Sequence, residues 1–281
     1  MAKHQDVKRQ RFSRQVLKRQ DDLQSLLCVG LDPDTNRIPA CCGSGESGIF
    51  NFCKAIVDAT AHSASCYKPQ IAYFAAASAE GALQDIIEYI KQLGVPVLLD
   101  GKRGDIGSTA EMYAVELFKR YNADATTVNP YMGLDSIQPY LDFEDRGIFV
   151  LCRTSNTGGA DLQHLRLEGG RKLYEEVAFR ARHKWNSKGN VGLVVGATRP
   201  EELAEIREIC GEMLLLLPGV GAQGADVGKL IAAGQGGGML ISSSRAILYA
   251  GADEKFAEAA QAAAESTRDE INRHKNMQNH R

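Results

Sequence analysis

The sequence predicts an α/β fold, a closed (β/α)₈ TIM barrel with an additional N-terminal helix. Short apolar runs alternate with amphipathic segments eight times along the chain. Parallel strands need helical crossovers of this kind, and eight units in about 250 residues is the usual size of such a barrel. A doubly wound sheet is the alternative, but it usually carries a glycine-rich phosphate loop after its first strand. Residues 31–34 read Leu-Asp-Pro-Asp at that place, which favours the barrel.

The expected strands are short runs of apolar residues, many of them bounded by glycine, proline or charged residues. The runs are continuous rather than alternating, as is typical of parallel strands that are buried on both faces. They are residues 26–32, 66–74, 96–100, 125–130, 147–155, 191–198, 214–220 and 238–244.

Between these runs, apolar residues recur every three or four positions, which predicts amphipathic helices. In the segment 79–93, for example, Leu83, Ile86 and Ile90 fall on one face. The segment 200–209 opens with proline, which is common at the first position of a helix. Residues 156–170 are polar and are expected to form a long loop. The expected helices are 8–25, 49–63, 79–93, one that ends near 121, 135–141, 173–185, 200–209, 225–233 and 253–275.

The composition is that of an ordinary globular protein. The 281 residues are 44% hydrophobic and 24% charged, with a net charge of −2, so no nucleic-acid surface is indicated. Residues 1–19 are basic without the apolar segment of a signal peptide, and no apolar run approaches the roughly 18 residues that span a membrane. Seven cysteines without a CxxC motif favour reduced thiols and a cytoplasmic protein. We expect one domain over 1–281, with a helical extension at 1–25 and a C-terminal helix and tail at 265–281.

Polar or flexible residues stand at the C-terminal ends of the expected strands. These ends converge on one face of a barrel, where its active site lies. One such residue would be weak evidence, because strand ends are often polar, but they occur in all eight units. They are Asp32, Lys68, Asp100, Lys102, Asn129, Ser155, Thr198, Gly221 and Arg245.

The end of the third strand carries the densest charge. Asp100 and Lys102 point the same way, because side chains alternate along a strand, and Asp105 follows closely. Burying such charges is costly unless they pair or take part in chemistry. The alternative is a salt-bridged strand end that leads into a helix capped by Ser108 or Thr109. The polar residues at the other strand ends favour a functional role.

The last two units indicate a phosphate site. Residues 218–224, Pro-Gly-Val-Gly-Ala-Gln-Gly, offer backbone N–H groups before a short helix, and Ser243-Ser244-Arg245 follows the eighth strand. Loops after strands seven and eight commonly hold phosphate in this fold, and helix N-termini favour anions. A tight turn is the alternative for the glycine run. None of the six histidines falls at an expected strand end, so we expect no metal, and Ser155 has no evident His-Asp partner.

These motifs resemble the orotidine 5'-phosphate decarboxylase family, in its longer bacterial branch. The pattern Asp-x-Lys-x-x-Asp at 100–105, with Thr109 four residues later, carries the resemblance, although alanine is more usual than Gly101. Four further segments agree, so that the resemblance extends from about residue 26 to 250. They are VGLDPD from 29, YKPQIAYF from 67, LCRTSN from 151, and PGVGAQG from 218 together with SSSRAI from 242.

The resemblance implies catalytic roles for the charged residues. Lys68, Asp100, Lys102 and Asp105 would form an alternating charge network. In it, Lys102 would protonate C6 of the pyrimidine, and Asp100 would lie against the substrate carboxylate. The resemblance also implies a homodimer in which Asp105, Ile106 and Thr109 reach into the site of the neighbouring subunit.

The remaining implied roles concern substrate binding. Asp32 and Lys68 would bind the ribose, Ser155 the pyrimidine edge, and Pro218 would line the pocket near the departing carboxylate. The phosphate would be held by the last two units, with Gln223 and Arg245 as its main ligands. The substrate-binding set there is Gly221, Gln223, Ser244 and Arg245.

The implied activity is decarboxylation of orotidine 5'-phosphate to uridine 5'-phosphate, the last step of de novo pyrimidine synthesis, without metal or cofactor. Two alternatives stay open. One is a magnesium-dependent sugar-phosphate enzyme of the same superfamily, such as a hexulose-phosphate synthase or a ketogulonate-phosphate decarboxylase. Such an enzyme needs an additional acid as metal ligand, whereas the second strand offers Lys68. The other is a non-catalytic nucleotide-binding barrel, which would have no reason to keep Lys102 between two acids.

Overall fold

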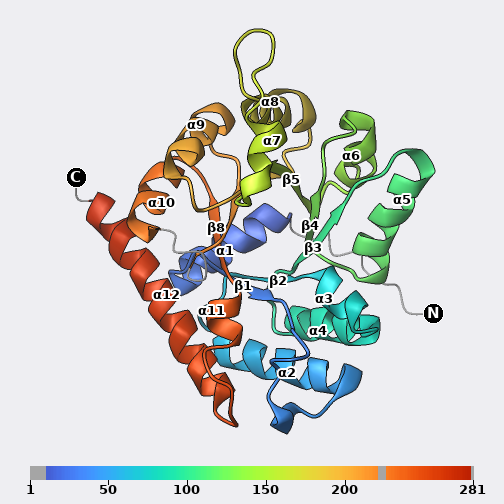
Figure 1. Ribbon diagram of the computed structural model, residues 1–281, viewed down its shortest axis with the longest axis vertical. Helices are drawn as coiled ribbons and strands as arrows, with labels where there is room; N and C mark the ends of the chain where they lie inside the picture. Colours follow the sequence, from blue (N-terminus) through green and yellow to red (C-terminus); the bar gives the residue numbers. More distant parts are fainter. Residues whose placement is uncertain (1–10, 221–225, 280–281) are drawn as a thin grey trace, which may run out of the picture.

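The fold is a parallel barrel of eight strands (Figure 1). The computed structural model describes residues 11–279 except 221–225. The strands occur where apolar runs were predicted, and their residues are almost all buried. They are β1 (Leu27–Leu31), β2 (Cys66–Pro69), β3 (Leu98–Arg103), β4 (Ala125–Val128), β5 (Gly147–Arg153), β6 (Val191–Val195), β7 (Leu215–Pro218) and β8 (Met239–Ser243).

The strands pair in the order β2-β1-β8-β7-β6-β5-β4-β3, all in parallel. Two isolated parallel bridges, Tyr67 with Val97 and Gln70 with Asp100, connect the two outer strands β2 and β3. The barrel is therefore nearly closed, and the prediction of a (β/α)₈ fold is confirmed. The closure matters for function, because it brings the ends of β2 and β3 together.

Helices surround the strands and bury an apolar face against them (Figure 1). Each of the described helices is too short or too polar to cross a membrane. The helices of the outer ring are α2 (Gly45–Thr60), α4 (Glu80–Gln92), α5 (Gly107–Val115), α6 (Leu134–Leu141), α8 (Leu173–Arg180), α9 (Pro200–Cys210), α10 (Val227–Gly234) and α12 (Phe256–Asn279). The shorter α3 (Ile71–Ala76), α7 (Ala160–Gln163) and α11 (Arg245–Leu248) follow the ends of β2, β5 and β8.

Helix α1 (Phe12–Leu23) lies across the N-terminal end of the barrel (Figure 1). Phe12 and Val16 are buried and belong to a core cluster inside the barrel, where Phe12 meets Phe149 edge to face at 5.8 Å. The Gln20 amide donates a hydrogen bond of 2.7 Å to the main-chain carbonyl of Met239. The N-terminal helix therefore closes the barrel at this end, and its predicted residues 8–10 lie outside the described part.

Three local predictions differ from the structure. The strand expected at 66–74 ends at Pro69, because Ile71–Ala76 forms α3; a short apolar run does not distinguish a strand from a buried helix. The loop expected at 156–170 contains α7. Neither Ser108 nor Thr109 caps a helix, since α5 begins at Gly107 without a side-chain cap.

Candidate active site

A buried carboxylate, Asp100, is the centre of a charge cluster at the C-terminal ends of β2 and β3. The ammonium nitrogen of Lys102 lies 2.7 and 2.8 Å from its two oxygens, and that of Lys68 lies 3.2 Å from Oδ2. The side chains of Lys68 and Asp100 are only 7% and 6% exposed, whereas that of Lys102 is 46% exposed. The cluster therefore holds two fixed inner charges and one cation that reaches into the mouth of the barrel.

Two neutral side chains, which the sequence analysis did not identify, hold Asp100 in place. The amide of Gln70 donates a hydrogen bond of 3.0 Å to Oδ2, and the hydroxyl of Thr127 donates one of 2.7 Å to Oδ1. Thr127 is fully buried in β4. The two adjacent threonines, Thr126 and Thr127, in an otherwise apolar strand are the signal that could have pointed to it.

The backbone of Lys102 is strained. Its φ is +43°, in the left-handed region that is unfavourable for a residue with a side chain, and the register of β3 against β4 shifts between Leu99 and Arg103. The N–H of Lys102 donates a hydrogen bond of 2.9 Å to Oγ1 of Thr127. One hydroxyl thus bonds both to the strained backbone and to Asp100. Strain that the surroundings hold in this way is characteristic of functional sites.

The charges in the cluster stabilise one another. Burial alone would raise the pKa of Asp100, but the positive charges of Lys68 and Lys102 and the hydrogen bonds from Lys102 and Thr127 lower it to about 2. Burial alone would lower the pKa of Lys68, but the negative charges of Asp100 and Asp32 raise it well above its usual range. Asp100 and Lys68 are therefore both charged at neutral pH.

Asp32 stands at the end of β1, beside this cluster. One of its oxygens lies 3.9 Å from the ammonium of Lys68, and the other accepts a hydrogen bond of 2.5 Å from the hydroxyl of Ser244. Its main-chain carbonyl accepts a bond of 2.9 Å from Tyr249, which the sequence analysis did not identify. A Cβ at Gly30 would lie 2.7 Å from that of Ser244, so glycine permits this close approach.

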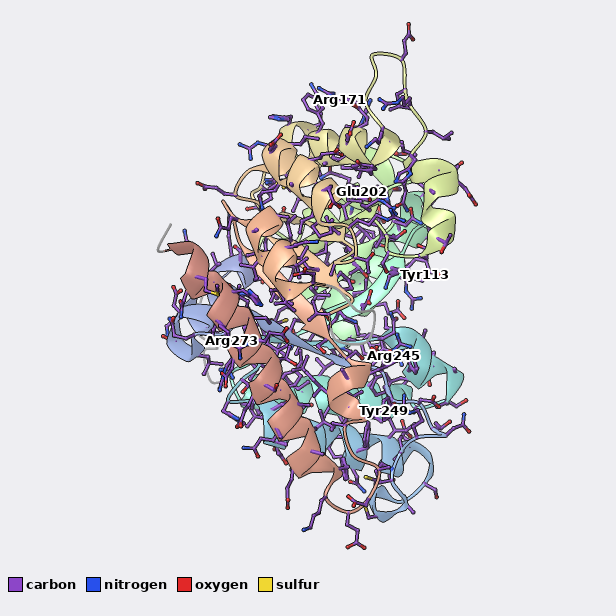
Figure 2. All side chains as sticks on the ribbon, turned by 60° about the vertical axis from the view of Figure 1, so that its left-hand side comes forward. Tyr113, Arg171, Glu202, Arg245, Tyr249 and Arg273 are labelled. Atoms are coloured by element: carbon purple, nitrogen blue, oxygen red, sulfur yellow. The ribbon has the colours of Figure 1, made fainter. Side chains whose placement is uncertain are left out.

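The remaining predicted residues follow β5, β7 and β8. Ser155 comes two residues after the end of β5 and is exposed, and Pro218 ends β7 beside Ser242 of β8. Arg245 is exposed at the start of α11, close to Tyr249 in Figure 2. Gly221 and Gln223 lie outside the described residues.

Asp105, Ile106 and Thr109 lie apart from the cluster, just beyond the end of β3. Asp105 accepts a hydrogen bond of 2.8 Å from the N–H of Ile106, and no ion pair in the described part of the chain joins it to Lys102. Ile106 is 56% exposed, and the neighbouring α5 and the β4–α6 loop expose further apolar side chains at Met112 and Tyr131. The structure thus leaves these three large apolar side chains exposed in the segments that follow β3 and β4.

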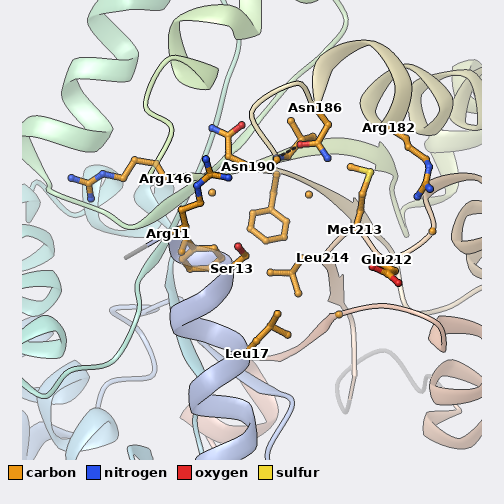
Figure 3. A pocket seen from close by; sticks show the side chains of 18 residues that line it. Arg11, Ser13, Leu17, Arg146, Arg182, Asn186, Asn190, Glu212, Met213 and Leu214 are labelled. Atoms are coloured by element: carbon orange, nitrogen blue, oxygen red, sulfur yellow. Dashed lines mark hydrogen bonds between the residues drawn. The ribbon is translucent and has the colours of Figure 1, made fainter. Parts of the chain in front are cut away.

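A separate cavity of about 490 Å³ lies at the opposite end of the barrel (Figure 3). Its lining includes Arg11, which precedes α1, together with Phe12 and Leu17 of α1, and also Arg182 and Met213. Residues of α1 and of the N-terminal ends of strands line it, whereas the charge cluster lies at the C-terminal ends of β2 and β3. The described residues contain no group of three or more His, Cys, Asp or Glu that could hold a metal ion.

Comparisons with known proteins point to one family. The model of a family described as "Orotidine 5'-phosphate decarboxylase / HUMPS family" matches residues 25–261. A protein of Ralstonia pickettii named orotidine 5'-phosphate decarboxylase is 57% identical over 271 residues, 95% of this chain and 100% of the relative. One of Azoarcus sp. with the same name is 60% identical over 253 residues, 88% of this chain and 93% of the relative.

Solved structures show the same likeness. The structure of Leishmania donovani OMP decarboxylase is similar with a TM-score of 0.82 at 42% identity, covering 94% of this chain and 98% of that chain. A structure titled as a putative orotidine-monophosphate-decarboxylase from Toxoplasma gondii has a TM-score of 0.86 at 37% identity, covering 95% of this chain and 96% of that chain.

Proposed function

This chain belongs to the orotidine 5'-phosphate decarboxylase family, and we propose that it converts orotidine 5'-phosphate into uridine 5'-phosphate and carbon dioxide. The observation that carries the proposal is the position of Lys102. Its ammonium is held 2.7 Å from an oxygen of Asp100 at the mouth of the barrel. The buried Lys68 donates a hydrogen bond to the same carboxylate. A cation fixed beside an anion suits a reaction in which the negative charge of a carboxylate moves to a carbon atom as neutral carbon dioxide leaves.

In the proposed reaction, the bond between C6 of the pyrimidine and the carboxylate carbon breaks. Carbon dioxide leaves, and the bonding electron pair stays on C6 as a carbanion whose lone pair lies in the plane of the ring, where it cannot delocalise into the ring π-system. The ammonium of Lys102 stabilises this charge and then gives its proton to C6, which completes uridylate; solvent returns the proton to the lysine. Fixed charges of this kind need no reorganisation when the transition state forms.

Asp100 has a second role in this proposal. Its carboxylate would lie against the carboxylate of the substrate, so that their repulsion is relieved as carbon dioxide departs. Asp100 is already ionised before substrate binds, because Lys68, Lys102 and Thr127 together lower its pKa to about 2. The neutral donors Gln70 and Thr127 keep it from turning away.

Substrate binding is assigned to the surrounding strand ends. Asp32 and Lys68 bind the ribose, Ser155 binds the pyrimidine edge, and Pro218 lines the wall near the departing carboxylate. Ser244 and Arg245 hold the phosphate together with Gly221 and Gln223. Binding energy from the phosphate, far from the reacting carbon, can then be expressed in the transition state.

We further propose a homodimer with shared sites, in which Asp105, Ile106 and Thr109 serve the partner. The exposed apolar surface at Ile106, Met112 and Tyr131 supports this, as does the lack of an ion pair between Asp105 and its own Lys102 among the described residues. Lys102→Ala and Asp105→Ala proteins are each expected to be inactive. When they are mixed, unfolded and refolded together, about a quarter of the sites should be intact. A mixture that contains heterodimer by mass but has no activity would contradict the shared site.

The proposed activity is tested by following the absorbance change from orotidylate to uridylate, with and without EDTA. Full activity in EDTA is expected, because the end of β2 offers Lys68, Pro69 and Gln70 and no acidic metal ligand. Loss of activity that Mg²⁺ restores would instead assign the chain to the metal-dependent sugar-phosphate enzymes. The cytoplasm is the proposed location, because all seven cysteines are free, as in proteins of reducing compartments.

A further inference from the structure

A polar cluster lies behind Ser155, where it contacts neither Lys102 nor Asp100. It is formed by Arg153 at the end of β5, Gln163 of α7 and Glu202 of α9, and we refer to these three residues as the β5 clamp. Arg153 is only 4% exposed, and its Nε donates a hydrogen bond of 2.6 Å to Oε2 of Glu202. A buried guanidinium needs such a charged partner, so Glu202 fixes the position of Arg153. Figure 2 shows Glu202 well separated from Arg245.

Gln163 connects this ion pair to the backbone next to Ser155. Its Oε1 accepts hydrogen bonds from the N–H of Thr154 at 2.9 Å and from Nη1 of Arg153 at 3.1 Å. Its Nε2 donates one of 2.8 Å to the hydroxyl of Thr154, and that hydroxyl donates one of 2.6 Å to Asn156. Arg153 also donates to the carbonyl of Thr154. These hydrogen bonds therefore fix the positions of Thr154 and Asn156, the residues on either side of Ser155.

Two glycines allow this dense packing. A Cβ at Gly159 would lie 2.9 Å from both Nη1 of Arg153 and Oγ1 of Thr154. A Cβ at Gly196, after β6, would lie 2.9 Å from the Cβ and the backbone nitrogen of Ser155. The segment that carries Ser155 thus has the clamp on one side and β6 on the other, and little room remains for another backbone position.

His164 adds a second attachment to the clamp. Its Nε2 lies 3.0 Å from Oε1 of Glu202, whose other oxygen accepts from Arg153. Both oxygens of the Glu202 carboxylate are thereby used, one by the end of β5 and one by the loop after α7. Glu202 therefore connects α9 of the outer ring to the segment that contains Ser155.

We propose that Arg153, Gln163 and Glu202 are positioning residues for pyrimidine recognition. They touch no substrate themselves; they fix Thr154 and Asn156, and through them the hydroxyl of Ser155. This rests on the proposed function, in which Ser155 binds the pyrimidine edge. The clamp then determines how strongly the site prefers a ligand with a base over the same sugar phosphate without one.

The test compares two ligands that share ribose and phosphate. Inhibition constants are measured for uridine 5'-phosphate and for ribose 5-phosphate, using wild-type protein and the Gln163→Leu variant. We expect uridylate to bind about tenfold more weakly to the variant, the value of one well-placed hydrogen bond, and ribose 5-phosphate to bind unchanged. Glu201→Gln is the matched control, because Glu201 is exposed on the same helix as Glu202.

A double-mutant cycle decides whether the clamp acts through Ser155. In a Ser155→Ala background, Gln163→Leu should have no further effect on uridylate binding, because the group it positions is gone. Glu202→Gln should behave like Gln163→Leu in both backgrounds. Equal losses of affinity for uridylate and for ribose 5-phosphate would contradict the positioning role of the β5 clamp. So would additive effects of Gln163→Leu and Ser155→Ala on uridylate binding. Neither result would contradict the proposed function. Wild-type protein that neither binds uridylate nor converts orotidylate would overturn the proposed function as well.

Discussion

The two ends of the barrel bury different kinds of residue, apolar at the N-terminal end and charged at the C-terminal end. At the N-terminal end, α1 covers the strands with Phe12 and Val16, and the polar Gln20 there bonds to a main-chain carbonyl. At the C-terminal end, Lys68 and Asp100 are buried as charges, and Lys102 adopts a φ of +43°. Burying apolar area stabilises a fold, whereas burying charge and holding a strained backbone cost free energy.

This difference shows how the chain separates stability from chemistry. The left-handed conformation of Lys102 costs about 1–2 kcal/mol, which the hydrogen bond from its N–H to Thr127 and the surrounding packing must offset. Apolar packing at the other end is one source of that stability. We therefore expect substitutions at the charged end to affect turnover more than folding, and substitutions at the apolar end to do the reverse.

Lys102→Ala should produce the largest effect. We expect kcat to fall by about 10⁴-fold, because both a proton donor and a fixed charge are lost, while the variant still binds uridylate. Its melting temperature should fall only modestly, because Lys68, Gln70 and Thr127 still bond to the buried Asp100 and the apolar core is intact. Lys18→Ala, at an exposed lysine of α1, is the control and should keep full activity. A Lys102→Ala protein that retained a tenth of kcat would exclude this lysine as the acid.

Phe12→Ala tests the other end. Phe12 is 2% exposed and packs on Phe149, so its loss should lower the free energy of unfolding by about 3–5 kcal/mol. At a temperature where the variant is folded, kcat should change less than twofold. Urea denaturation and steady-state kinetics measure the two quantities. Leu17→Ala, on the same helix but 44% exposed, should cost under about 1 kcal/mol. If Phe12→Ala lowered kcat strongly in folded protein, the two ends would not be independent.

Thr127→Val removes the hydroxyl that bonds to both Asp100 and the backbone of Lys102. We expect kcat to fall about tenfold, because a buried carboxylate loses a donor and Lys102 loses its backbone partner. Thr127→Ser keeps the hydroxyl and should retain most of the activity. The adjacent Thr126 bonds to the carbonyl of Leu99 instead, so Thr126→Val should reduce stability with little change in kcat. Equal kinetics for the valine and serine variants at 127 would contradict a positioning role.

The smallest effect that we expect is on the pH dependence of the free energy of unfolding at acidic pH. The pKa of Asp100 is about 2 in the folded protein, below its unfolded value of about 3.9, so its contribution is present above about pH 4 and is lost as pH falls toward 2. Lys68→Met removes one of the charges that lower this pKa. The folded pKa of Asp100 should then rise toward its unfolded value, so the loss of stability on acidification should be smaller than in the wild type, which urea midpoints between pH 3 and 7 would show.

The control for this experiment is Lys18→Met at the apolar end. It should reproduce the wild-type pH dependence, because Lys18 is exposed and pairs with Asp22 rather than with Asp100. Parallel curves for wild type and Lys68→Met would show that Lys68 does not hold Asp100 in its charged form. The raised pKa of Lys68 affects the free energy of unfolding at alkaline pH instead. Its contribution is complete below its unfolded pKa near 10.4 and is lost as pH rises through the higher folded value.

Much of this arrangement could be predicted from the order of residues along the chain. Eight apolar runs separated by helical periodicity leave few alternatives to a barrel, and the polar ends of those runs indicated the residues at its mouth. Asp32, Lys68, Asp100 and Lys102 were predicted in this way, and the structure brings them together. Such predictions succeed because they depend on local patterns, which repeat with the period of the element that they form.

Only the tertiary structure showed what holds those charges in place. Thr127 comes 25 residues after Lys102, and Glu202 comes 49 residues after Arg153, and neither separation follows a helical or strand period. Which hydroxyl meets a strained backbone, or which carboxylate meets a buried arginine, depends on the register between neighbouring strands and on how outer helices pack. Those are set by the summed packing of many side chains, so no short stretch of sequence contains them.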